Sequence, residues 1–271
     1  MTRDYRIRFV LIVTLIGLIS TGLAIAADSP IIDRILSNGV LKVGMSGNQA
    51  PMNARNNNDQ LIGLEVDLAN MIAAAMEVKV EFVVKPFPEL LPALKSGEVD
   101  IVMSGMTITA KRTADFSFVG PYMLSGKSIL TKSTLLAAAD EAGDINEEHL
   151  TVTALKDSTS ETFVKQYLPK VTLVTSDDYD KAVKMVVDGE ADVLVADMPV
   201  CVTSVLKYPE ADLVTLTRPL TVEPFGIAIP ATDAQLLNLL ENYLRTLEEM
   251  EVLDDLKRKW LDNGAWISTI P

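Results

Sequence analysis

The chain has little material for the chemistry of reactive side chains. Its 271 residues include one cysteine, Cys201, and one histidine, His149. A single thiol cannot form an internal disulfide, and the flanking Val200 and Val202 predict a buried, apolar cysteine. His149 lies in the polar segment DINEEHL, where we expect an exposed side chain. These scarcities argue against Ser-His-Asp, Cys-His and histidine-cluster sites, so we expect neither a metal nor a cofactor.

Residues 1–26 have the pattern of a secretory signal. Three arginines among the first eight residues precede an apolar run over 9–23, and Ala24-Ile25-Ala26 supplies small residues for cleavage. The run is nearly long enough to span a bilayer, so an uncleaved anchor is the alternative. Threonine, serine and glycine within the run favour cleavage. No cysteine follows the site, which argues against a lipoprotein.

Positive charge is scarce in the rest of the chain. Once the three Arg and one Asp of residues 1–26 are removed, 21 of the 24 basic and 36 of the 37 acidic side chains remain, a net charge of −15. Such a surface repels nucleic acid and anionic lipid, so we expect a soluble protein with no nucleic-acid partner. About 245 residues form one large domain or two smaller ones.

One sequence unit occurs twice. SGEVDIVMSGM, residues 96–106, returns as DGEADVLVADM, residues 188–198, and Gly97 and Gly189 mark the offset of 92 residues. Each copy ends a helical pattern and enters a short apolar strand. Strands alternate with helices around both copies, which predicts an α/β fold with right-handed parallel crossovers. We therefore expect two lobes of similar build, each a mostly parallel sheet flanked by helices.

The periodicity also predicts the individual elements and the domain boundaries. Helices are expected at about 31–38, 64–76, 88–97, 160–169, 178–189, 233–250 and 253–264, and strands at about 41–45, 78–85, 99–105, 150–156, 171–175, 191–197 and 223–230. Two extended segments without helical period, near 126–133 and 211–221, are expected to join the lobes. Lobe 1 would then comprise 27–127 and 221–271, and lobe 2 would comprise 128–220.

The two copies of the repeat differ where their strands end. Ser104-Gly105-Met106-Thr107 ends the strand in lobe 1, and Ala196-Asp197-Met198 ends the strand in lobe 2. Ligands of open parallel sheets lie beyond the carboxyl ends of the strands, so we expect both ends to face a shared cleft. Arg112 follows shortly after, and a guanidinium binds a carboxylate through two parallel hydrogen bonds. Arg112 and Asp197 would fit a zwitterion that draws the lobes together. The alternative, a surface arginine and a helix N-cap before Pro199, stays open.

Several segments resemble one family over most of the chain and in the right order: GLEVDLANMIA, LLPALKSGEVDIVMSGMTITAKR, DFSFVGPY and VDGEADVLVADMP. They are similar to the amino-acid-binding proteins of ABC importers, solute-binding protein family 3. The resemblance implies the type II periplasmic-binding-protein fold, with two lobes and a double-stranded hinge. It also implies a periplasmic monomer without enzymatic activity, whose partners are a free amino acid and the membrane permease of an ABC importer.

The resemblance also implies a ligand-binding set. Arg112, helped by Thr107, would hold the α-carboxylate, and Thr159 in DSTSE would complete that site at a helix N-terminus. Asp197 would pair with the ammonium, and Ser104 and Gly105 would accept hydrogen bonds from it.

Other positions bear on the ligand's side chain. Phe87 matches a position that often stacks on the ligand, although a core phenylalanine is the alternative. The family usually has an aromatic residue where this chain has Met52, and a glycine where it has Asp157. With a less aromatic pocket, a neutral polar amino acid is favoured, while acidic and basic amino acids stay open.

The same resemblance includes an enzymatic branch, cyclohexadienyl dehydratase, which acts on prephenate or arogenate. That reaction needs a proton donor for the leaving hydroxyl. The branch has a glutamate three residues after the aspartate of the lobe 2 strand, where this chain has Val200. Asp157 or Glu223 would have to replace it, and nothing in the sequence places either in the cleft. A third interpretation, delivery of an amino acid to a receptor, differs only in the partner.

Overall fold

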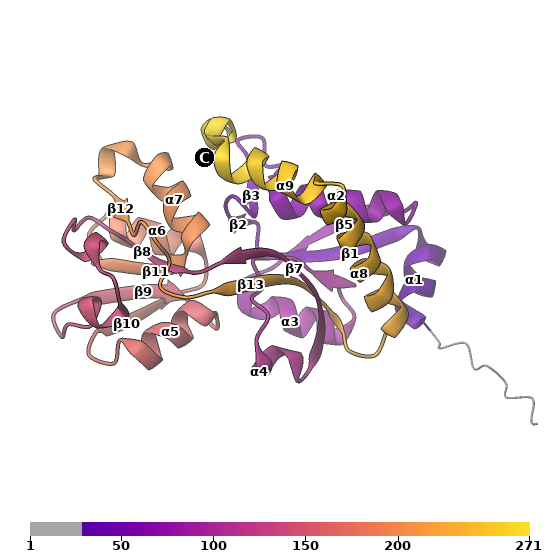
Figure 1. Ribbon diagram of the computed structural model, residues 1–271, viewed down its shortest axis with the longest axis horizontal. Helices are drawn as coiled ribbons and strands as arrows, with labels where there is room; N and C mark the ends of the chain where they lie inside the picture. Colours follow the sequence, from indigo (N-terminus) through magenta and orange to yellow (C-terminus); the bar gives the residue numbers. More distant parts are fainter. Residues whose placement is uncertain (1–28) are drawn as a thin grey trace, which may run out of the picture.

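The computed structural model describes residues 29–271, and the predicted signal segment therefore lies outside the described part of the chain. Two lobes lie beside each other and are joined by long strands (Figure 1). Each lobe is built on its own five-stranded sheet. The predicted α/β architecture of two sheet-based lobes is thus confirmed.

The sheet of lobe 1 has the order β5-β1-β6-β13-β7. Its strands are β5 (Lys79–Val84), β1 (Val40–Met45), β6 (Ile101–Val102), β13 (Glu223–Pro230) and β7 (Phe116–Ser125). The first three are parallel, and β13 is antiparallel to both β6 and β7. The helices of this lobe are α1 (Pro30–Asn38), α2 (Leu64–Ala75), α3 (Phe87–Ser96), α4 (Ala110–Thr113), α8 (Ala234–Glu249) and α9 (Val252–Lys257).

The sheet of lobe 2 has the order β10-β9-β11-β8-β12. Its strands are β10 (Thr172–Ser176), β9 (Thr151–Leu155), β11 (Val193–Asp197), β8 (Lys127–Thr131) and β12 (Val214–Thr215), and its helices are α5 (Thr159–Tyr167), α6 (Tyr179–Val187) and α7 (Met198–Lys207). Again the first three strands are parallel, and β8 is antiparallel to both of its neighbours, β11 and β12. The two copies of the sequence repeat form β6 and β11, each the middle strand of its sheet.

Two strands run side by side where the lobes meet (Figure 1). β7 continues through Gly126 into β8. The segment that leads back to lobe 1, from residue 220 into β13, is the return strand and lies against this connection. The backbone N–H of Lys127 donates to Oγ1 of Thr221 at 2.9 Å, and the N–H of Leu220 donates to the carbonyl of Lys127 at 2.7 Å. A Cβ at Gly126 would lie 2.0 Å from the carbonyl oxygen of Thr221, so only glycine permits this approach. The exact domain boundaries stay a prediction.

Apolar periodicity explains the core of lobe 1. Along α8, Leu236, Leu240, Leu244 and Leu247 are buried at helical spacing, as the sequence predicts. A second buried cluster contains residues of both lobes, among them Phe87 of α3 and Val200 of α7. The lobes are therefore in direct contact.

The two rare side chains lie as expected. Cys201 is fully buried in α7, and burial raises the pKa of its thiol to about 12. The side chain of His149 is 73% exposed and lies beside Glu147.

A small three-stranded sheet lies between β1 and α2, in a segment for which the sequence predicts neither a helix nor a strand. Its strands are β2 (Asn48–Gln49), β3 (Asn53–Arg55) and β4 (Leu61–Ile62). Strands of two or three residues, rich in asparagine, are too short to give an alternating pattern, which explains why the sequence does not indicate them.

The C-terminal tail extends from lobe 1 towards lobe 2. After α9 the chain forms a π turn, η4 (Arg258–Asp262), and a 3₁₀ turn, η5 (Gly264–Thr269). Trp266 packs on Trp260 with ring centroids 5.5 Å apart. The N–H of Asn57 donates to the carbonyl of Thr269 at 2.7 Å, while Ile270 and Pro271 lie beside α7 of lobe 2.

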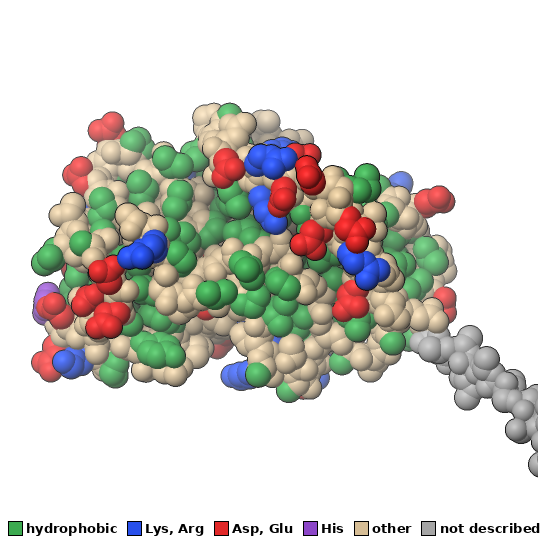
Figure 2. Space-filling view, viewed as in Figure 1, with side chains coloured by type: hydrophobic (Ala, Val, Ile, Leu, Met, Phe, Trp, Pro, Cys, Tyr) green, Lys and Arg blue, Asp and Glu red, His purple; other side chains and the backbone are tan. Residues whose placement is uncertain are grey.

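Acidic and basic side chains lie next to one another over α8 and α9 on the face shown in Figure 2. Lys257 pairs with Asp254 within α9, and Arg258, the first residue of η4, pairs with Asp255 of α9. Over residues 29–271, no helix is both long and apolar enough to cross a membrane.

Candidate ligand-binding cleft

Arg112 is fixed on the lobe 1 side of the cleft. It lies in the short helix α4, whose N-cap residue Thr109 accepts the Arg112 N–H at 3.2 Å. Its Nη1 donates to the carbonyl of Thr107 at 2.8 Å, and its guanidinium lies 5.7 Å from the ring centroid of Phe87. Desolvation lowers the pKa of Arg112, whereas Asp197 and Glu223 raise it. Arg112 is half-buried and held in place, and both its ligand-binding role and the alternative of a surface arginine stay predictions.

Thr159 of lobe 2 contacts the lobe 1 side of the cleft. Its Oγ1 lies 3.3 Å from Oγ1 of Thr107, which makes a direct contact between the lobes. Thr159 is the first residue of α5, and Oγ of the preceding Ser158 accepts the N–H groups of Ser160 and Glu161. Two of the free N–H groups at this helix end are therefore already used. Phe87, Arg112 and Thr159 line the same cavity, of about 560 Å³.

Ser104 and Gly105 follow β6 and lie against the first strand–helix connection of lobe 1. Ser104 Oγ accepts the N–H of Ser46 at 3.1 Å. Gly105 has a φ of +53°, and a Cβ there would lie 2.1 Å from Nε2 of Gln49. Glycine is favoured here by the backbone conformation, and it lets the end of the Gln49 side chain approach closely.

The backbone of Gly105 is hydrogen-bonded to a buried carboxyl group, that of Glu65. Glu65 of α2 is fully buried and accepts hydrogen bonds from the Gly105 N–H at 2.7 Å, from Asn53 Nδ2 at 2.6 Å and from the hydroxyl of Tyr122. Desolvation raises the pKa of Glu65, and the three hydrogen bonds lower it. The network links the Gly105 turn to the helix beneath it.

Asp197 ends β11 and occupies the N-cap position of α7, but its side chain makes no capping hydrogen bond. The N-cap alternative is therefore right about the position and wrong about the role. Oδ1 lies 2.7 Å from Nζ of Lys127, and the Tyr179 hydroxyl lies 3.5 Å from Oδ2. Nζ of Lys127 also lies 3.7 Å from Glu223. Burial raises the pKa of Asp197, and Lys127 lowers it.

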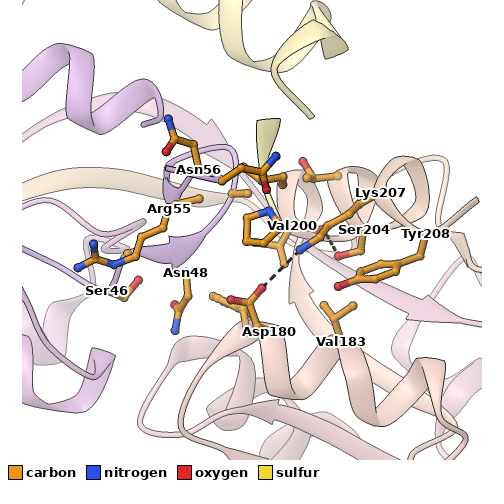
Figure 3. A pocket seen from close by; sticks show the side chains of 18 of the residues that line it. Ser46, Asn48, Arg55, Asn56, Asp180, Val183, Val200, Ser204, Lys207 and Tyr208 are labelled. Carbon is orange, nitrogen blue, oxygen red and sulfur yellow. Dashed lines mark hydrogen bonds and ion pairs between the residues drawn. The ribbon is translucent and has the colours of Figure 1, made fainter. Parts of the chain in front are cut away.

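A second cavity, of about 540 Å³, lies on the Tyr179 side of the cleft (Figure 3). Lobe 1 lines it with Ser46, Asn48 and Arg55, among others, and lobe 2 with Asp180, Val200 and Lys207, among others. In Figure 3, Asp180 and Lys207 point towards each other, and their charged atoms are 3.9 Å apart. Asn48 lies opposite them, and its Oδ1 is buried without a hydrogen-bond partner.

Of the seven predicted residues, Phe87, Arg112 and Thr159 line one cavity, and Thr107 contacts Thr159. Ser104, Gly105 and Asp197 are buried and line neither of the two cavities. The structure leaves the roles of all seven towards a ligand as predictions. It also adds groups that the sequence analysis missed or left unplaced: Lys127, Glu223, Tyr179 and Glu65. A signal existed for Lys127, because it is the only charged residue in the segment YMLSGKSILT. A lysine inside a buried strand needs a carboxylate partner.

The structure explains how aspartate fits at position 157, where the family usually has glycine. Asp157 has a φ of 56°, a left-handed conformation that glycine adopts without cost and aspartate tolerates. Within residues 29–271, no group of three or more His, Cys, Asp and Glu side chains is placed to hold a metal ion.

Comparison with known proteins agrees with this architecture. Cyclohexadienyl dehydratase of Pseudomonas aeruginosa is 25% identical over 239 residues, which cover 88% of this chain and 89% of that protein. The crystal structure of AncCDT-1, described as an ancestral amino acid-binding protein and a precursor of cyclohexadienyl dehydratase, is 35% identical. Its TM-score is 0.77, with 85% of this chain and 99% of the other covered.

A third relative is the binding component of an ABC transporter from Wolinella succinogenes, in complex with lysine. It is 32% identical with a TM-score of 0.81, and the match covers 85% of this chain and 99% of that one. The model of the bacterial extracellular solute-binding proteins, family 3, matches residues 41–263. The chain therefore belongs to this family of solute-binding proteins and has its two-lobed, type II periplasmic-binding-protein fold.

Proposed function

We propose that the protein binds a free amino acid between its lobes in the periplasm and delivers it to the membrane permease of an ABC importer. The observation that supports this proposal is the proximity of opposite charges from the two lobes. Arg112 belongs to lobe 1 and Asp197 to lobe 2, and each is close enough to influence the pKa of the other. Membership of the family supports the same function.

In the proposed complex, the α-carboxylate lies on Arg112 and the hydroxyls of Thr107 and Thr159. The ammonium lies on Asp197 and on the oxygens of Ser104 and Gly105. Because each wall holds one end of the zwitterion, the ligand stabilises the closed arrangement of the lobes over an open one. Phe87 packs on Arg112 and borders the carboxylate site.

The energy required of these contacts is modest. Micromolar affinity corresponds to about −8 kcal/mol. Hydrogen bonds to charged groups contribute roughly 1.5–3 kcal/mol each, and closure of the cleft removes water from them. A bidentate arginine contact, an ammonium contact and the burial of a side chain are sufficient after the cost of ordering the lobes.

An enzyme of the cyclohexadienyl dehydratase type is the second candidate, because relatives of that name cover most of the chain. At the position of the expected glutamate, Val200 has an apolar side chain and cannot transfer a proton. Glu223 is the carboxyl group that the fold adds where the two lobes join, and it is 8% exposed. Its carboxyl group lies 3.7 Å from Nζ of Lys127, so it is already engaged by a side chain of the protein, and no described contact aims it at a ligand.

Calorimetric titration tests both candidates. The processed protein is freed of bound ligand by unfolding and refolding, and is then titrated with each standard L-amino acid, prephenate and arogenate. Tight binding of one or a few amino acids, with prephenate and arogenate unchanged on incubation, is the expected result. No binding of any amino acid, together with aromatic product from either cyclohexadienyl acid, would replace the transport function by the enzyme.

A further inference from the structure

Lys127, Asp197 and Glu223 lie together where the two lobes join, a region that we call the cleft floor. Binding of the ligand's carboxylate by Arg112 and of its ammonium by Asp197 does not require the cation of Lys127. Lys127 is fully buried, and its Nζ lies between Asp197 of lobe 2, at 2.7 Å, and Glu223 of the return strand, at 3.7 Å. We propose that Lys127 is a built-in counter-cation. It makes the cleft electrically neutral before the ligand enters, and the cleft therefore selects amino acids with uncharged side chains over cationic or anionic ones. This inference rests on the proposed function.

The backbone holds Lys127 in place on both sides. β8 pairs with β11 in antiparallel register, and Lys127 is the direct partner of Asp197. The backbone N–H of Lys127 donates to Oγ1 of Thr221, and its carbonyl accepts the N–H of Leu220. Directly opposed residues of an antiparallel pair point to the same face, so the side chains meet because of the register. A buried ammonium separated from its carboxylate would be strongly unfavourable, which keeps the pair together.

The charges around this pair balance. The groups that interact electrostatically with Asp197 come from six elements: Lys127 of β8, Glu223 of β13, Arg112 of α4, Tyr179 of α6, Cys201 of α7 and Tyr122 of β7, whose pKa burial also raises well above its ordinary value. Burial raises the pKa of Tyr179 well above its ordinary value and that of Cys201 to about 12, so both are neutral at physiological pH. Two cations, Arg112 and Lys127, then face two anions, Asp197 and Glu223.

The cavity of Figure 3 has room for the side chain of a ligand, and the charges of the side chains that line it also balance. With the α-carboxylate on Arg112 and the ammonium on Asp197, we expect the side chain of the ligand to extend into the cavity of Figure 3, which Tyr179 lines. The charged side chains lining that cavity form two pairs, Arg55 with Asp59 at 2.9 Å and Lys207 with Asp180 at 3.9 Å. Neither pair leaves an excess charge for a cationic or anionic side chain, whereas Ser46, Asn48 and Ser204 offer hydrogen bonds.

A zwitterion with a neutral side chain keeps this balance, and a charged side chain breaks it. Like charges a few ångströms apart at low effective dielectric cost enough to change affinity by about an order of magnitude or more. Without Lys127, one carboxylate would be in excess, and a cationic side chain would supply the missing charge.

The test compares L-glutamine, L-arginine and L-glutamate by calorimetric titration. In the native protein, glutamine is expected to bind at least about tenfold more tightly than either charged amino acid. Lys127→Met should raise the affinity for arginine relative to glutamine by about tenfold. Glu223→Gln should shift the preference in the opposite direction, towards glutamate. The double variant Lys127→Met/Glu223→Gln restores neutrality and should return the native preference.

Lys184→Met is the matched control, because Lys184 is an exposed lysine of α6 that pairs with Asp188 away from the cleft. It should leave all three affinities unchanged. Equal or tighter binding of arginine in the native protein would overturn the inference, as would unchanged preference in Glu223→Gln and the double variant. Those results would leave amino-acid binding itself intact. Absence of binding to all three probes and to every other amino acid would instead refute the proposed function, and the inference with it.

Discussion

Lys127 and Asp197 are paired both through their backbones and through their side chains. They are register partners across β8 and β11, and Nζ of the lysine lies 2.7 Å from Oδ1 of the aspartate. The carboxylate expected to bind the ligand's ammonium thus already has a cation. A carboxylate has about four lone-pair positions, so Asp197 can accept from Lys127 and from a ligand together.

This pairing makes Asp197 important for stability as well as for binding. We expect Asp197→Ala to lower the free energy of unfolding by about 3–5 kcal/mol, because it leaves Lys127 buried beside a single, more distant carboxylate. Urea denaturation measures the change. Adding Lys127→Met to Asp197→Ala should recover most of the loss, since no unpaired ammonium is left. An Asp197→Ala variant as stable as the native protein would show that the ion pair contributes nothing to folding.

Arg112 should affect binding far more than stability. Its guanidinium is half-buried and its Nη1 bonds a loop carbonyl, so Arg112→Ala removes a charge without opening the core. We expect its affinity for the amino acid to fall by about a hundredfold or more, since two charge-assisted hydrogen bonds are lost. Lys111→Ala is the control, because the adjacent exposed lysine lines the same cavity without bonding Thr107. Similar affinities in both variants would place the carboxylate site elsewhere.

Gly105 offers a test of the close approach beside the site. Gly105 and Gly39 have similar conformations, with φ of +53° and +65°, but a Cβ meets Gln49 at Gly105 and nothing within 4 Å at Gly39. Gly39→Ala should cost about 1–2 kcal/mol of stability and leave binding unchanged. Gly105→Ala should cost more and weaken binding as well, because Gln49 must move. Equal effects of the two substitutions in melting and titration experiments would show that backbone strain is the whole cause.

Glu65 should make stability depend on pH in a defined direction. Desolvation raises its pKa in the folded protein above the ordinary value of 4.5. Between 4.5 and the raised pKa, the folded state therefore binds more protons than the unfolded state, and stability falls as pH rises. Glu65→Gln removes this titration and keeps the size of the side chain. We expect the native protein to lose stability relative to Glu65→Gln between pH 4 and pH 7 in urea denaturation. A constant difference across that range would contradict the raised pKa.

The sequence predicted the two lobes because their elements are long and strongly periodic. The helix expected at 64–76 is found as Leu64–Ala75, and the strand expected at 41–45 as Val40–Met45. The small sheet of β2, β3 and β4 was missed, since strands of two or three residues have no period to detect. β6 is also shorter than expected, because the chain turns at Ser104 and Gly105 rather than continuing the sheet.

The site was predictable where charge stands out at the end of a strand, as at Asp197. The pairing of Asp197 with Lys127 was not predictable, because it depends on the register between β8 and β11, which no local sequence pattern indicates. Glu65 shows a similar limit. It lies in the first turn of α2, where an acidic residue is ordinary, and its three hydrogen-bond donors come from segments distant in the sequence.

The C-terminal tail adds a mechanical element to this architecture. It is attached to lobe 1 by the hydrogen bond from Asn57 to Thr269, and its last two residues rest beside Lys207 and Tyr208 of lobe 2. The lobes are thus connected at the hinge strands and touch again at the tail, which lies at the mouth of the cavity beside Tyr179. The tail thus adds a contact between the lobes that is separate from the hinge strands, and any rotation of the lobes about those strands would change this contact too.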